Sequence, residues 1–164
     1  MPSTYTPIAT TTLGSAQSTV TFSSIPSTYT DLVLISSSGL TTATGDTTFT
    51  FNTDTASNYS FTALYGTGST AASIRSANRA NISIYESPTT VLGATTSSLN
   101  IFNYANATTY KTTVSRGTSA GAITSAVVGL WRSTAAINQI VIANNGSTTF
   151  ITGSTFTLYG IKAA

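Results

Sequence analysis

Threonine or serine alternates with apolar residues along much of this chain. Five segments follow the pattern most clearly, at residues 18–22, 48–51, 81–85, 98–102 and 155–159. An alternation of period two places every second side chain on the same face of a pleated strand. Thr, Val, Ile, Tyr and Phe dominate these segments, and they suit strands because β-branched and aromatic side chains lose rotamer freedom in helices. The pattern predicts strands with one apolar, buried face and one hydroxyl-rich face.

Three further segments are apolar without interruption, at residues 32–35, 126–131 and 140–142. Such runs are typical of strands that are covered on both faces or that lie at a contact between subunits. Turn residues separate the segments, and Asn145-Gly146 gives the strongest hairpin signal because strand-like residues flank it on both sides. Residues 70–80, with alanines and one isoleucine at near-helical spacing, are the only candidate for a helix.

The density of strands, without alternating helices, indicates an all-β fold. The 164 residues, of which 40% are hydrophobic, suffice for one domain with a real core. We expect an antiparallel β-sandwich, jelly-roll-like, with about eight strands. Residues 1–164 would form this single β-sandwich domain, with the N-terminal residues as an extended arm. A stacked solenoid is disfavoured because the string at 2–6 recurs only once, at 26–30.

The chain contains no histidine and no cysteine, and only 6% of its residues are charged. The side chains that most often transfer protons or bind metals are therefore missing. We expect the protein not to be an enzyme, with no catalytic residue, no cofactor-binding residue and no metal ligand. An enzyme of unknown type is the last alternative, because its acid and base groups would have to come from four carboxylates.

Those carboxylates favour structural roles. Asp46 and Asp54 flank a threonine-rich strand, so a hairpin could join them as a glycosidase pair or a calcium site, although turn residues that bond their own backbone are the favoured interpretation. Asp31 is expected at a strand entry or beside an arginine, and Glu86 at an exposed strand end. A serine nucleophile would need Lys111 or Lys162 as its base.

Two other motifs are weak. Gly66-Thr67-Gly68 resembles part of a phosphate-binding loop, but it lacks the Gly-Lys and the helix that such loops need. Trp131 is expected in the core beside other apolar residues, and the alternative is an exposed aromatic platform for a sugar or a protein.

Charge and hydropathy exclude two classes of partner. The net charge is only +2, and the six cations are scattered, so we expect no nucleic-acid binding. No apolar stretch approaches the length of a membrane span and no signal peptide is visible, so we expect a soluble protein without membrane contact. Charged side chains normally protect sheet edges, and here few exist for that purpose. We therefore expect edges and apolar strips to be covered by neighbouring molecules.

Several strings resemble small virion proteins of tailed bacteriophages. They are TPIATTTL at 6–13, VTFSSIP at 20–26 with YTDL at 29–32, FN at 51–52 with SNYS at 57–60, VGLWRS at 128–133 and GSTFTLYGI at 153–161. The resemblance runs nearly end to end. It implies a non-catalytic, all-β component on the capsid surface or in the tail and its fibres.

Because the chain has no long repetitive shaft, we expect a head decoration or cement protein. The resemblance implies a homotrimer that binds the major capsid protein or other virion proteins, in a virion assembled in the host cytoplasm. Two alternatives stay open. A tail-fibre or tail-tip component would hold a host surface glycan with exposed tyrosines and Trp131. An ice-binding protein would need a flat threonine ladder at a fixed repeat, and the two-copy repeat disfavours it.

Overall fold

A computed structural model of the chain describes residues 4–119 and 121–162. These residues form twelve β-strands and no α-helix. The strands are β1 (Tyr5–Thr12), β2 (Thr19–Phe22), β3 (Asp31–Ser38), β4 (Thr47–Phe51), β5 (Tyr59–Gly66), β6 (Ala71–Arg79), β7 (Ile82–Ser83), β8 (Thr95–Ile101), β9 (Lys111–Ser119), β10 (Ile123–Trp131), β11 (Ile140–Asn144) and β12 (Thr155–Ile161).

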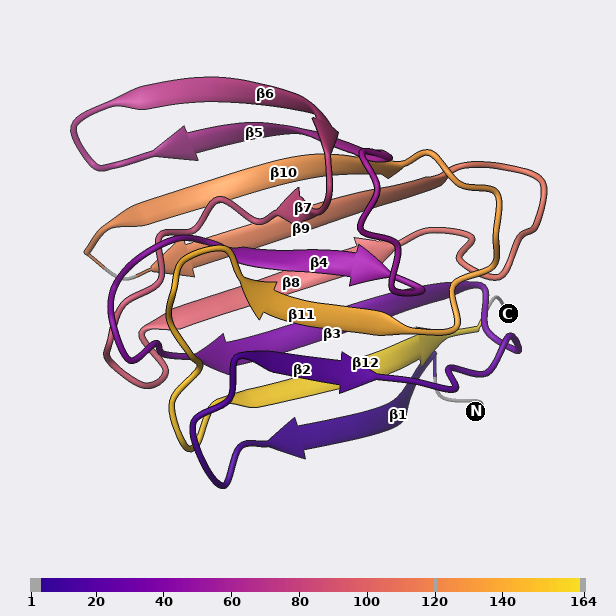
Figure 1. The fold of residues 1–164 in the computed structure, drawn as a ribbon, viewed down its shortest axis with the longest axis horizontal. Helices are drawn as coiled ribbons and strands as arrows, with labels where there is room; N and C mark the ends of the chain where they lie inside the picture. The colour runs from indigo at the N-terminus through magenta and orange to yellow at the C-terminus, as the bar shows by residue number, and fades with distance from the viewer. Residues whose placement is uncertain (1–3, 120, 163–164) are drawn as a thin grey trace.

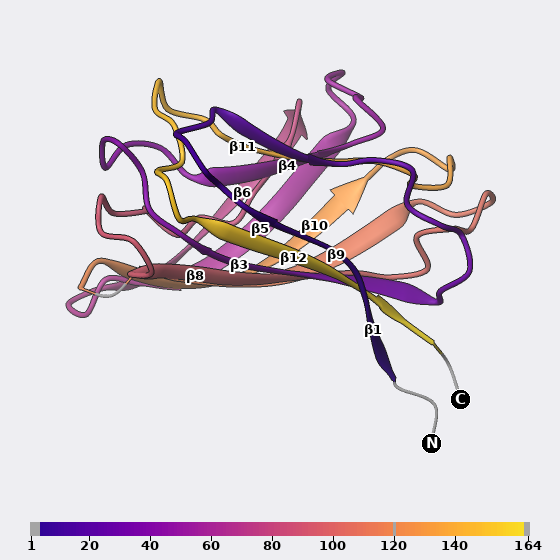
Figure 2. The same cartoon turned by 90° about the horizontal axis from the view of Figure 1, so that it is seen from below.

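Two sheets pack face to face, as Figure 2 shows from the side. The large sheet has eight strands in the order β1-β12-β3-β8-β9-β10-β5-β6, and the small sheet has four in the order β2-β11-β4-β7. All neighbouring strands pair antiparallel. The predicted all-β antiparallel sandwich is confirmed, with twelve strands in the described residues instead of about eight. The small sheet covers only part of the large one, and the edge strand β6 extends beyond it (Figure 1).

The core lies between the sheets and is rich in aromatic side chains. Phe51 of the small sheet lies 5.6 Å from Trp131 of the large sheet, measured between ring centroids. Tyr59 stacks on Trp131 with the ring planes 14° apart. All three side chains are buried, so the expectation that Trp131 belongs to the core is confirmed. Large aromatic side chains bury more apolar area than any others, and the hydrophobic effect at this cluster holds the two sheets together.

Four of the five alternating segments form strands largely as predicted, whereas only residues 82–83 of the segment 81–85 do. Apart from exposed Phe102, which follows β8, their apolar side chains point into the sandwich. In β12, for example, Phe156 and Leu158 are buried, whereas Thr155 and Thr157 between them are half-buried on the outer face. The uninterrupted segments behave differently from the expectation of cover on both faces. Ile35 of β3 is 46% exposed and Val128 of β10 is 54% exposed, because both side chains point to the outer face of the large sheet, over which no described part of the chain packs. A subunit contact at this face stays a prediction.

Two local predictions are wrong. Residues 71–79 form β6 instead of a helix, because pairing with β5 outweighs the near-helical spacing of small alanine side chains. The Asn145-Gly146 turn does not join a hairpin of residues 140–143 and 149–151, since residues 149–151 form no strand and Phe150 bridges Gln17 and Leu40 instead of β11. Asn145 is instead hydrogen-bonded to the residue before β4: its Oδ1 accepts a hydrogen bond from the Asp46 amide at 2.7 Å.

The ends of the described chain lie side by side, as Figures 1 and 2 both show. Tyr5 of β1 pairs with Ile161 of β12, so from Tyr5 onward the chain belongs to the sheet. The expected N-terminal arm is thereby limited to the residues before β1, of which 1–3 lie outside the described residues. Within the described ranges, no helix is long and apolar enough to cross a membrane.

Candidate functional site

The outer face of the large sheet is the most distinctive surface of the molecule. The strand registers align its outward side chains in three rows that cross all eight strands. The first row is Thr12, Thr155, Ser37, Thr96, Thr118, Thr124, Gly66 and Ala71. The second is Thr10, Thr157, Ile35, Ser98, Arg116, Ala126, Leu64 and Ser73. The third is Pro7, Tyr159, Val33, Asn100, Val114, Val128, Thr62 and Arg75.

These rows contain almost no charge, since Arg75 and Arg116 are their only ionisable groups apart from the phenol of Tyr159. The first row carries hydroxyls on six neighbouring strands and ends in Gly66 and Ala71. A flat threonine array of the kind that ice binding needs does not extend to the next rows, where Arg116 and Tyr159 interrupt it. The face is instead a mixture of short hydroxyl and apolar side chains, and such residues lose little rotamer entropy when a partner covers them.

One end of this face, over β9, β10, β5 and β6, has an apolar centre. Leu64 is 63% exposed there, and Val128 projects beside it from the neighbouring strand. Arg116 on β9 and Arg75 on β6 lie at opposite sides of this centre. We call the surface formed by Leu64, Val128, Ala126, Arg116 and Arg75 the Leu64 face. An apolar centre with charged groups only at its rim is the usual arrangement of a protein–protein contact.

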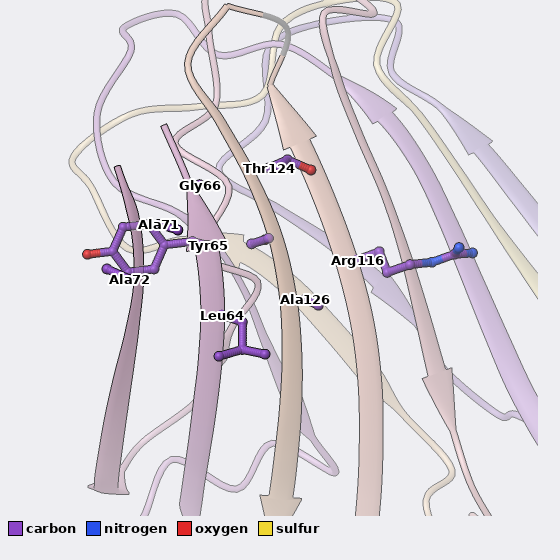
Figure 3. A pocket seen from close by; sticks show the side chains of 9 residues that line it. Leu64, Tyr65, Gly66, Ala71, Ala72, Arg116, Thr124 and Ala126 are labelled. Atoms are coloured by element: carbon purple, nitrogen blue, oxygen red, sulfur yellow. The ribbon is translucent and has the colours of Figure 1, made fainter. Parts of the chain in front are cut away.

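The Leu64 face is hollowed. A shallow, open depression of about 630 Å³ lies between Leu64 and Arg116. Figure 3 shows these two side chains on either side of Thr124 and Ala126, with the small residues of β10 between them. The depression forms because the small side chain of Ala126 on β10 lies between the larger side chains of Leu64 on β5 and Arg116 on β9. It could receive an apolar side chain of a partner.

The cations on this side of the molecule have no carboxylate partner. Within the described residues, no ion pair or hydrogen bond involves the guanidinium of Arg75, Arg79 or Arg116. Arg132, by contrast, donates to the Ser57 carbonyl at 2.6 Å and to Asn78 Oδ1 at 3.1 Å. Three of the six cations are therefore available to an outside partner.

The four carboxylates are engaged or buried inside the chain. Asp46 and Asp54 lie at opposite ends of β4, so the strand separates them and the predicted alternative of a joint catalytic or calcium site is wrong. Asp46 accepts hydrogen bonds from the Ser83 hydroxyl at 3.0 Å and the Ser87 amide at 3.2 Å. Its partners come from a distant segment, so it ties the approach to β4 to the chain that follows β7.

Asp54 has the turn role that the sequence favours and a second role that the sequence does not reveal. Its Oδ1 accepts from the Ala56 amide at 2.9 Å, and its Oδ2 accepts from Asn58 at 2.9 Å and from the Trp131 indole N–H at 2.7 Å. Burial raises the pKa of Asp54, but the hydrogen bonds from Asn58, Trp131 and Ala56 together hold that pKa below its usual value. The carboxylate therefore orients the core tryptophan.

Asp31 begins β3, as predicted, and its Oδ1 accepts from the Asn103 amide at 2.7 Å. Glu86 contradicts the expectation of an exposed strand end, because it is only 1% exposed. Neither of its carboxylate oxygens has a hydrogen-bond partner in the described residues. The chain buries Glu86 because Gly117 of β9 leaves room for it, and a methyl group there would lie 3.0 Å from Glu86 Oε2.

Neither lysine activates a serine. Lys111 is buried, and its ammonium donates to the carbonyls of Thr109 at 2.7 Å and Thr134 at 3.2 Å. Burial lowers the pKa of Lys111. Lys162 lies 5.7 Å from the ring centroid of Tyr29, a cation–π contact. These contacts hold loops and chain ends in place.

Gly66-Thr67-Gly68 belongs to the turn between β5 and β6. The Thr67 amide donates to the Thr70 carbonyl at 2.9 Å, which closes a tight hairpin, and Gly68 has the positive φ of 87° that the turn requires. In residues 4–119 and 121–162, no group of three or more acidic side chains is close enough to hold a metal ion.

The comparisons add no relative to this description. No protein-family model matches the chain, and no curated protein is significantly similar to it.

Proposed function

We propose that this protein is a virion structural protein of a tailed bacteriophage, a capsid decoration or cement protein that docks on neighbouring capsid subunits through the outer face of its large sheet. The observation that carries the proposal is the Leu64 face: exposed Leu64 and Val128 surrounded by short hydroxyl side chains and only two cations. The resemblance of the sequence to small phage virion proteins supplies the biological setting.

The energetics of such a face suit a passive binding protein. Complete burial of a leucine or valine side chain contributes about 1.5–3 kcal/mol. Leu64 and Val128 already lose part of their exposure in the free chain, so each would contribute about 1 kcal/mol on docking. The hydroxyls around them keep their freedom to hydrogen bond across the contact, and there are few charges to desolvate. Repetition over many sites of a lattice would then add to its stability.

The strand order supports the expected jelly-roll topology, which stays part of the proposal. The large sheet begins with the four strands β1-β12-β3-β8, the small sheet has the four strands β2-β11-β4-β7, and two sequence-adjacent hairpins, β9–β10 and β5–β6, extend the large sheet. Jelly rolls pair two four-stranded sheets in this way and are frequent in viral capsid proteins, although fold alone does not determine function. On this interpretation the Leu64 face lies entirely on the two added hairpins.

A glycan-binding component of the tail is the weaker alternative. Trp131, the aromatic side chain that this function would use first, is buried and donates its indole N–H to Asp54. A homotrimer, implied by the resemblance, also stays a proposal.

The test is to purify the phage that encodes the chain and to measure the protein in separated heads and tails by mass spectrometry. The proposal predicts that the copy number of the protein per head matches the number of equivalent binding positions on the capsid lattice. Absence of the protein from heads contradicts it. Leu64→Asp should keep the melting temperature of the free protein but reduce the amount on heads about tenfold or more, since a buried charge disfavours docking. Val91→Asp is the matched control, because Val91 is equally exposed, at 62%, but lies outside the Leu64 face.

A further inference from the structure

Strand β6 (Ala71–Arg79) ends the large sheet with an open edge, and we propose that an extended, carboxylate-bearing segment of a partner protein adds to this edge as a ninth strand. The inference rests on the proposed function, which supplies a partner, and it names the chemistry of that partner.

The edge strand is unusually bare. β6 pairs only with β5, and most of its residues are exposed. Its outer face continues the Leu64 face through Ser73 and Arg75. Its inner face is only partly covered, since Ile74 points to the side of the small sheet but is still 37% exposed. The position of β6 beyond the small sheet accounts for this exposure (Figure 1).

The backbone of β6 presents free hydrogen-bonding groups at regular intervals. Thr67 and Thr70 form the closing pair of the hairpin, through the Thr67 amide and the Thr70 carbonyl. In an antiparallel pair, successive residues direct their N–H and C=O groups alternately toward and away from the neighbouring strand. Counting from Thr70, the groups of Ala71, Ser73 and Arg75 face the open edge, whereas those of the residues between them face β5. An unpaired row of this kind is a template for another strand.

The opposite edge of the same sheet is protected. β1 contains Pro7, which has no N–H to donate, and its register shifts between Pro7 and Ala9. Proline and bulges are the usual devices that prevent edge pairing. β6 has no proline, and its irregularity is confined to its end, near Asn78 with its positive φ of 53°. The regular stretch, residues 71–76, is long enough for a partner strand of about six residues.

The charges identify the partner as an acidic segment instead of a second copy of this chain. Arg75 and Arg79 lie on β6 itself, and Arg116 lies three strands away on the same outer face, a distance of about 14 Å at the usual strand spacing. None of the three has an acidic partner within the described residues, while all four carboxylates of the chain are used or buried elsewhere. A second copy would bring more arginine and no available acid.

The geometry also sets the pattern of the segment. Side chains of an added strand would alternate between the outer face, beside Arg75, and the inner face, beside Ile74. Carboxylates at one set of alternate positions and apolar side chains at the other would match both faces. Opposite charges on neighbouring strands contribute about 0.2–1 kcal/mol for each pair.

The test uses two synthetic peptides of about eight residues, one alternating Glu with Val and the other alternating Lys with Val. Fluorescently labelled peptides are titrated with the full chain, and binding is followed by anisotropy. We expect the acidic peptide to bind about fivefold more tightly than the basic one, because Arg75 attracts a neighbouring glutamate by about 0.5 kcal/mol and repels a neighbouring lysine by a similar amount. Arg75→Glu should remove or reverse this preference, and equal binding of the two peptides would overturn the proposal.

Ser73→Pro removes an amide that faces the open edge without removing a bond to β5, so it should abolish peptide binding. Ser73→Ala keeps the amide and should bind as the unchanged chain does. Amide exchange at Ala71, Ser73 and Arg75 should slow when the acidic peptide is present. Peptide binding that survives Ser73→Pro refutes strand addition. A dimer of the free chain that Ser73→Pro dissociates refutes the acidic partner, because β6 would then pair with β6 of a second copy.

The particle separates this inference from the proposed function. If the Ser73→Pro and Leu64→Asp variants are both missing from heads, both proposals are supported. Normal incorporation of Ser73→Pro together with loss of Leu64→Asp overturns the edge inference and leaves the docking role in place. Absence of the unchanged protein from heads overturns the proposed function, and the peptide titration then decides the edge inference by itself.

Discussion

Glu86 should make the protein less stable as the pH rises through neutrality. Its carboxylate is 1% exposed, and neither oxygen accepts a hydrogen bond from the described residues. Burial, with a smaller contribution from the charge of Asp46, raises the pKa of Glu86 from 4.5 to about 7, although the nearby Thr47 hydroxyl opposes this shift without forming a hydrogen bond of good geometry. The folded chain therefore holds this proton over a range in which the unfolded chain releases it.

The sign of the effect follows from proton binding. Below pH 4.5 the group is protonated in both states and contributes no pH dependence. Between pH 4.5 and about 7 the folded state binds more protons than the unfolded state, so the free energy of unfolding falls as the pH rises. At about 1.4 kcal/mol for each pKa unit, the total loss is about 3 kcal/mol at pH 8.

Equilibrium urea unfolding measures this loss, with the fluorescence of Trp131, the single tryptophan, as the signal. The free energy of unfolding is determined at several values between pH 4.5 and 8 for the unchanged chain and for Glu86→Gln. The difference between the two proteins isolates Glu86 from Asp54, whose lowered pKa makes stability fall only when the pH becomes more acidic. Glu86→Gln should lack the decline, and parallel curves for the two proteins would refute the account of a buried, unpaired carboxylate.

Two further substitutions test the packing. Trp131→Phe removes the indole N–H that donates a hydrogen bond to Asp54 at 2.7 Å, and it should reduce the free energy of unfolding by about 1–3 kcal/mol. Urea unfolding followed by circular dichroism measures this change. An unchanged free energy of unfolding would mean that the hydrogen bond does not stabilise the fold. Gly160→Ala would place a methyl group 2.3 Å from the Tyr29 ring and should cost about 1–3 kcal/mol, whereas Gly14→Ala, with no atom within 4 Å, should change stability little; equal melting temperatures for the two variants would contradict the close contact.

The alternation of threonine and apolar residues was sufficient to predict the sandwich, because period-two patterning records directly which side chains face a core. Residues 48–51 and 155–159, for example, form β4 and β12 with their phenylalanines buried. Local patterns failed where tertiary pairing decides the structure. The alanines of β6 fit either a helix or a strand, and the flanks of Asn145-Gly146 do not reveal that Phe150 pairs with Gln17 and Leu40 instead of with β11.

The candidate site was predictable only in outline. Uninterrupted apolar runs at 32–35 and 126–131 indicated a second apolar face, and exposed Ile35 and Val128 agree with that signal. The sequence could not place Leu64 beside Val128, because their proximity depends on the register of two strands, β5 and β10, that are far apart in the chain. Glu86 was missed for a similar reason, since the space that buries it comes from Gly117 on another strand.

The position of β12 has a consequence for biosynthesis. β12 lies between β1 and β3, and the contact between Thr10 and Thr157 spans 147 positions of the chain. While the chain is still on the ribosome, β1 and β3 have no neighbour at these edges until residues 155–161 have been translated. Contacts between such distant segments slow folding, and unpaired strands are prone to aggregation while they wait. The nascent protein should therefore depend on chaperones or on low temperature during expression far more than the finished sandwich does.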